Sequence, residues 1–173
     1  AVSMGLISRE KSLGTIEIIS TMPILEREIV LGKYFAGLAL ILLGLVTTLI
    51  HYITLISVGS STDHGAVFAG YLGLALLGGV YTSVSLFASS ITDNQVIAFI
   101  VGIAIVLVFF MLDKLLFFVP PSLSGVIQYL GTDFHLSNMS RGVIDTRNLI
   151  YFGSVIGFFL ALTIRILESR KWN

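Results

Sequence analysis

The sequence predicts an all-α fold, a bundle of helices that crosses a membrane several times. Hydrophobic residues make up 55% of the 173 residues and charged residues only 12%, and the mean hydropathy is +0.98. A soluble domain carries roughly 25% charged residues and could not bury this much apolar surface. Apolar runs such as residues 103–110 do not alternate in polarity as the strands of a membrane β-barrel do, so helices are favoured.

Four stretches without Asp, Glu, Lys or Arg reach or approach the about 20 residues that a helix needs to cross about 30 Å of hydrocarbon. We expect spans at about 34–58, 66–88, 95–112 and 149–164. The short link before the third span offers Thr92 or Asp93 as its helix cap. The chain then divides into a segment at 1–33, a transmembrane domain at 34–168 that includes an outer segment at 113–147, and a tail at 169–173.

Positive charges fall mostly on one side of these spans, and that side is usually cytosolic. Seven lie on the favoured side: Arg9, Lys11, Arg27, Lys33, Arg165, Arg170 and Lys171. Three lie on the other: Lys114, Arg141 and Arg147. Both visible ends of the chain are therefore expected in the cytosol. In the outer segment, apolar residues at helical spacing follow Pro120 and Pro121, which predicts an interfacial or re-entrant helix, with an ordinary packed loop as the alternative.

Several classes of function are disfavoured by the residues themselves. The net charge is zero and there is no Cys, so nucleic-acid binding, disulfides and thiolate metal sites are not expected. Gly32-Lys33 is followed by Tyr34 instead of the Ser or Thr of a nucleotide-binding loop. The three His residues lack metal-ligand spacing, and His51, inside the first span, is more simply a packed His than a functional one. We expect no catalytic, cofactor or metal site in this chain.

Small residues recur at helical spacing in the last two spans. Gly153, Gly157 and Ala161 lie four residues apart, and Ala98 and Gly102 do the same in the third span. Such ridges let another helix approach closely. Close packing is the favoured interpretation, and sliding of helices during transport is the alternative.

Two segments of the chain resemble a known family. The first contains Arg9-Glu10-Lys11-Ser12-Leu13-Gly14-Thr15-Ile16-Glu17, then Pro23, then Val30-Leu31-Gly32-Lys33-Tyr34, and resembles the ABC-2 type transporter permeases. The second contains Arg141-Gly142-Val143-Ile144-Asp145-Thr146-Arg147 and is similar to the gliding-motility-associated ABC permeases and the related nitrous-oxide-reductase maturation permeases. The family has two further spans upstream, so the resemblance implies that the visible spans are the last four of six.

The resemblance also implies a site and partners. Residues before the first span would form a coupling helix that docks on a cytosolic ABC ATPase, which itself uses ATP and Mg. The implied coupling residues are Glu10, Lys11, Leu13, Gly14, Thr15, Ile16, Glu17, Ile19 and Pro23. Leu13, Ile16 and Ile19 would supply an apolar face, and the polar rim would consist of Glu10, Lys11, Glu17, Glu26 and Arg27. A helix that merely lies on lipid is the alternative. In the outer segment, the resemblance marks Arg141, Asp145 and Arg147 as candidate functional residues.

The expected function is therefore that of a permease subunit in the bacterial inner membrane. It would pair with a second permease, as a homo- or heterodimer surrounded by lipid, and couple ATP hydrolysis in a separate subunit to export or mechanotransmission, with gliding motility as one option. A non-transporting membrane anchor or scaffold is the alternative. An ion-coupled carrier is least expected, because such carriers need charged groups near the membrane midplane, and the predicted spans have none.

Overall fold

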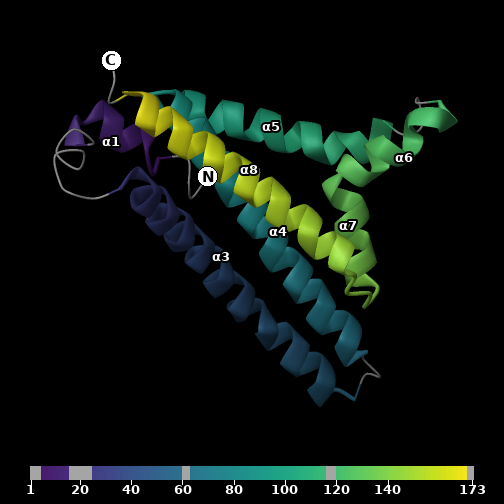
Figure 1. The fold of residues 1–173 in the computed structure, drawn as a ribbon. Coiled ribbons are helices and arrows are strands. Elements are labelled where there is room, and N and C mark those ends of the chain that lie inside the picture. Colours follow the sequence, from purple (N-terminus) through teal and green to yellow (C-terminus); the bar gives the residue numbers. More distant parts are fainter. Residues whose placement is uncertain (1–4, 16–24, 60–62, 116–119, 171–173) are drawn as a thin grey trace.

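The computed structural model describes residues 5–15, 25–59, 63–115 and 120–170, and these form helices joined by short links (Figure 1). The helices are α1 (Ser8–Ser12), α3 (Glu26–Ser57), α4 (His64–Ile91), α5 (Gln95–Leu115), α6 (Pro121–Leu130), α7 (Thr132–Ser140) and α8 (Thr146–Arg170). No strand occurs among the described residues. The predicted all-α fold is confirmed.

Four of these helices, α3, α4, α5 and α8, are long and apolar enough to cross a membrane, which confirms the four predicted spans. The helices extend beyond the apolar runs. α3 begins at Glu26, eight residues before the predicted span, and α8 continues past residue 164 to Arg170. Hydropathy identifies the part of a helix that lies in hydrocarbon, whereas the backbone can stay helical in the polar region beyond it.

Helix α4 lies at the centre of the bundle, and α3, α5, α7 and α8 all pack against it. In its most apolar stretch 44% of the residues are buried, against 11% in the corresponding stretch of α5. Glycines allow this crowding. A methyl group at Gly73 would lie 3.1 Å from Cβ of Met139 in α7, and one at Gly79 would lie 2.7 Å from the Tyr34 hydroxyl of α3. The glycines of α4 thus admit side chains of neighbouring helices.

The predicted outer segment is helical over most of its described length. Pro120 precedes α6 and Pro121 is its first residue, where the fixed φ of proline suits a helix start. α7 follows and packs against α4, α5 and α8. Gly142 then turns the chain with a φ of +85°, and a methyl group on it would lie 3.3 Å from Cα of Ala66. A residue other than glycine would be strained at this turn.

Side chains cap two of the spanning helices. Asp63 Oδ1 accepts hydrogen bonds from the first N–H groups of α4, at 2.9 and 3.3 Å. Asn94 Oδ1 accepts the Val96 N–H at 2.8 Å and caps α5. The predicted cap was Thr92 or Asp93. Instead, Thr92 Oγ1 accepts the Asn94 N–H at 3.2 Å, and Asp93 has a different partner, described below.

Candidate functional site

The site lies at one end of the bundle. There α1 meets the beginning of α3, the end of α4 and the beginning of α5, and α8 also ends nearby (Figure 1). We call the contacts of α1 with Lys33 of α3 and with residues 89–95 the α1 junction. The contacts with Ser89 and Ser90 join segments 79 to 82 residues apart in the chain.

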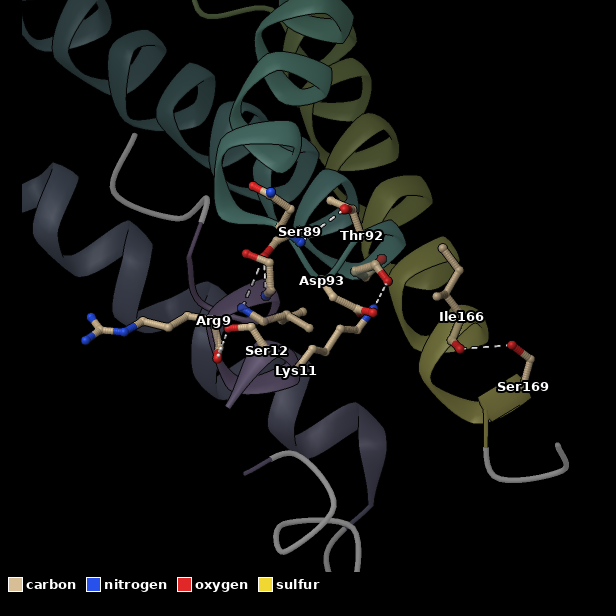
Figure 2. A network of polar contacts seen from close by, with 12 residues as sticks. Arg9, Lys11, Ser12, Ser89, Thr92, Asp93, Ile166 and Ser169 are labelled. Atoms are coloured by element: carbon tan, nitrogen blue, oxygen red, sulfur yellow. Dashed lines mark hydrogen bonds and ion pairs between the residues drawn. The ribbon is translucent and has the colours of Figure 1, made fainter. Parts of the chain in front are cut away.

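A serine of α4 holds the beginning of α1. The backbone N–H groups of Ile7 and Ser8 both donate to Ser89 Oγ, at 3.1 and 2.8 Å, and all three residues are fully buried. The first N–H groups of a helix have no partner within it, so a side chain from another helix satisfies them here. Figure 2 shows Ser89 beside α1. This cap fixes where α1 begins relative to α4.

A lysine of α1 holds the end of α4. The Lys11 ammonium donates to the carbonyl oxygen of Ser90, in the last turn of α4, and lies 3.8 Å from Asp93 Oδ1 (Figure 2). The Lys11 side chain is 1% exposed, whereas that of Asp93 is 61% exposed. The last carbonyls of a helix lack partners within the helix and favour a positive charge. The Lys11 ammonium therefore offsets the partial negative charge at the end of α4. The Asp93 carboxylate beside it is open to solvent.

A second lysine connects α1 to α3. Lys33 Nζ donates to the Leu6 carbonyl oxygen and to Glu10 Oε1, both at 2.6 Å. The Lys33 side chain is 16% exposed and that of Glu10 is 30% exposed, so the pair is partly buried. The other carboxylate oxygen of Glu10 is buried and has no hydrogen-bond partner among the described residues. Charged contacts thus tie α1 to two spanning helices.

Apolar packing completes the junction. Ile7 is fully buried in a cluster with Val30 and Tyr34 of α3, Leu86 of α4 and Leu160 of α8. Burying one such side chain stabilises a fold by about 1.5–3 kcal/mol. Ile7 therefore belongs to a buried cluster that contains side chains from three of the four spanning helices.

The other predicted coupling residues fall into two groups. Leu13, Gly14 and Thr15 are described: Leu13 is 66% exposed, Gly14 ends α1 with a φ of +69°, and the Thr15 hydroxyl donates to the Glu10 carbonyl at 3.2 Å. Outside the described residues lie Ile16, Glu17, Ile19 and Pro23.

The sequence pattern did not reveal part of the junction. Lys11 was expected on a polar rim at the surface, but its ammonium is buried against α4. Its partners at Ser90 and Asp93, and the Ser89 cap, were not identified, because polar residues at the end of a spanning helix are common. The one available signal was the pair Ser89-Ser90 directly after a long apolar run.

The two predicted packing ridges differ in their surroundings. Ala98 is 1% exposed, and a methyl group on Gly102 would lie 3.5 Å from Cβ of Ala88, so this ridge faces α4. Gly153, Gly157 and Ala161 are exposed on α8. A methyl group at Gly153 or Gly157 would meet no atom within 4 Å in the described part of the chain. No helix of that part covers this second ridge.

At the opposite end of α4 and α8, Arg141 and Arg147 are exposed, and Asp145 Oδ1 accepts the Arg147 N–H at 2.9 Å, near the start of α8.

Beside these residues is a buried cluster around His135 that the sequence analysis did not identify. His135 is fully buried, stacks on Tyr151 at a ring distance of 4.0 Å, and hydrogen-bonds through Nδ1 to Asn148 Oδ1 at 2.7 Å.

The α1 junction consists of contacts that join helices. Over the described ranges no group of three or more His, Cys, Asp or Glu side chains could hold a metal ion, and His51 is exposed on α3. What the junction offers is a set of hydrogen bonds and one apolar anchor that join a surface segment to the ends of spanning helices.

The comparison with protein families agrees with this architecture. Neither the comparison with curated proteins nor that with solved structures finds a match. The family model described as ABC-2 family transporter protein matches residues 1–165. The four spanning helices lie within this range or extend five residues beyond it. The chain is a multi-pass membrane protein and belongs to the ABC-2 family of transporter proteins.

Proposed function

We propose that this permease receives the motion of a partner ATPase at the α1 junction and transmits it to its spanning helices. ATP binding and hydrolysis take place in a separate cytosolic ABC ATPase with its Mg, and the permease carries out no bond chemistry. The observation that carries the proposal is the attachment of α1 to the end of α4 through Lys11 and to the beginning of α3 through Lys33. Rigid helices held at their ends move as bodies when those ends are displaced.

The surface beside α1 suits a docking partner. An open cleft of about 470 Å³ lies against α1 and is lined by Gly5, Leu6, Arg9, Glu10, Leu13 and Gln95. It combines exposed apolar surface at Leu13 with the charged groups of Arg9 and Glu10. Such a mixture of an apolar centre and a polar rim is typical of protein interfaces.

The finer assignments belong to the same proposal. The excess of Lys and Arg at the α1 end supports a cytosolic location for both visible ends, and the membrane in this proposal is a bacterial inner membrane. Two such permeases assemble with the ATPase as a homo- or heterodimer. The Arg141–Asp145 motif supports a relationship to the gliding-motility and nitrous-oxide-reductase maturation permeases, with export or mechanotransmission as the output.

The test uses the permease co-expressed with its ATPase. Leu13→Asp introduces a charge on the exposed docking surface, and we expect the ATPase to co-purify in reduced amount while membrane insertion stays normal. Val58→Asp is the matched control, because Val58 is 85% exposed but lies at the opposite end of α3. Glu17→Lys should act as Leu13→Asp does. The proposal is wrong if the wild-type permease never brings down an ATP-binding subunit, or if Leu13→Asp and Val58→Asp behave alike.

A further inference from the structure

A groove runs between α3 and α4 in the half of these helices nearest their connecting loop. It encloses about 550 Å³, within the range of about 300–1,000 Å³ typical of ligand pockets. Its walls are almost entirely apolar, with Leu42, Leu45 and Leu49 on α3 and Val67, Leu72 and Ala75 on α4. The α1 junction lies at the other end of these helices, so the groove is separate from it.

Hydroxyl and imidazole groups mark one half of the groove. Thr48 donates to the Leu45 carbonyl at 2.6 Å, so in its 2.9 Å contact with Tyr71 the tyrosine hydroxyl is the donor. Nearer the loop, the Tyr52 hydroxyl is hydrogen-bonded to Nδ1 of His64, the first residue of α4. Tyrosine and similar amphipathic rings concentrate where a membrane meets water. The loop end of the groove is therefore its polar end.

The length of the groove is close to the thickness of the hydrocarbon in one leaflet. From Leu42 to Tyr52 the α3 wall covers ten residue steps, or about 15 Å at 1.5 Å per residue. The α4 wall from His64 to Ala75 covers eleven steps, or about 16 Å. Half of a hydrocarbon core of about 30 Å is about 15 Å. The groove is thus about as long as one leaflet of the hydrocarbon core is thick.

The groove is continuous with the surface that faces lipid. Its edges are exposed apolar side chains, Val46 at 58% and Phe68 at 67%, on two helices that cross the membrane. We propose that the groove binds one alkyl chain of an amphiphilic lipid from the leaflet on the loop side. The polar head of this lipid lies beside Tyr52 and His64. This site does not depend on the proposed role of the α1 junction.

The experiment uses the purified full chain in nanodiscs of phosphatidylcholine that carries a photoreactive diazirine in its acyl chain. After illumination, peptide mass spectrometry locates the adducts. We expect several-fold more label per exposed apolar residue on 45–52 and 67–75 than on the exposed α5 residues Ile97 and Ile100, which are 50% and 61% exposed and lie outside the groove.

Filling the groove should remove that enrichment. Val46→Trp places an indole at its edge, and Leu43→Trp is the matched control because Leu43 is 62% exposed on the same helix but does not line the groove. We expect Val46→Trp to reduce groove labelling to the α5 level and Leu43→Trp to leave it unchanged. Ala75→Trp, on the other wall, repeats the test independently.

Three outcomes overturn the proposal. Equal labelling of the groove and of α5 means that lipid contacts the whole apolar surface and has no preferred binding site in the groove. Labelling of the groove below the α5 level means that another protein segment covers it. Equal effects of Val46→Trp and Leu43→Trp mean that the labelled lipid lies outside the groove. Co-purification of the ATPase is a separate measurement, so the failure of one proposal can be told from that of the other.

Discussion

The two ends of the helical bundle are held together by different forces. At the α1 junction the contacts are mainly charged, and the Asp93 carboxylate is 61% exposed. At the other end His135 is fully buried, its two ring nitrogens hydrogen-bond to Asn148 Oδ1 and to the Tyr129 carbonyl oxygen, and its ring stacks on Tyr151. At the α1 junction the exposed Asp93 carboxylate can exchange its partner with water, whereas the buried His135 cannot.

This difference has an energetic consequence. An exposed ion pair contributes about 0–1 kcal/mol, because water offers its members an alternative. A buried polar group that loses its partner costs about 1–3 kcal/mol. We therefore expect the α1 end to rearrange more easily than the end that contains α7. That asymmetry suits a protein driven from one end, with α7 holding the beginning of α8 in place.

The largest effect is expected from His135→Ala. The change removes the ring that stacks on Tyr151 and leaves Asn148 Oδ1 and the Tyr129 carbonyl without their partner. Replacing a buried ring by alanine costs about 3–5 kcal/mol, and we expect a loss of that size in the free energy of unfolding. Equilibrium unfolding in mixed detergent micelles measures it.

His135→Phe separates the contribution of the hydrogen bonds to this loss from that of the packed ring. Phenylalanine keeps the ring but not the hydrogen bonds, so we expect a loss of about 1–3 kcal/mol for the stranded polar groups. If His135→Phe were as stable as wild type, the hydrogen bonds would contribute nothing, and the buried end would be held by packing alone.

Lys11→Met should have an intermediate and local effect. Methionine fills the space of the lysine stem but cannot donate to the Ser90 carbonyl. A hydrogen bond to a charged group contributes about 1.5–3 kcal/mol. Because Asp93 is largely exposed, the change leaves no buried unpaired carboxylate there. We expect faster amide hydrogen exchange in α1 and at the end of α4, with exchange in α7 unchanged. Equal acceleration in α7 would contradict the separation of the two ends.

The sequence predicted elements far better than contacts between elements. Length and hydropathy suffice for α3, α4, α5 and α8, since lipid imposes helices on long apolar runs. They say nothing about Lys11, because its partner at Ser90 lies 79 positions away and is a backbone carbonyl that no residue type signals. His135 and Asn148 lie 13 positions apart on different helices, so no periodicity connects them. Burial decides both contacts, and burial depends on how the helices pack.

The smallest effect is expected from Lys114→Met, which tests whether burial or charge makes the difference. Lys114 Nζ lies 3.2 Å from Asp133 Oδ2, much as Lys11 approaches Asp93, but the two side chains are 58% and 40% exposed. Lys114 also lies 5.8 Å from the centroid of the Phe110 ring, an exposed contact worth about 0.5–1 kcal/mol. We expect the loss of both contacts to lower the free energy of unfolding by at most about 2 kcal/mol. A loss equal to that of Lys11→Met would mean that the buried ammonium is no stronger a tie than an exposed one, and the α1 junction would then depend on Ile7 and the Ser89 cap instead.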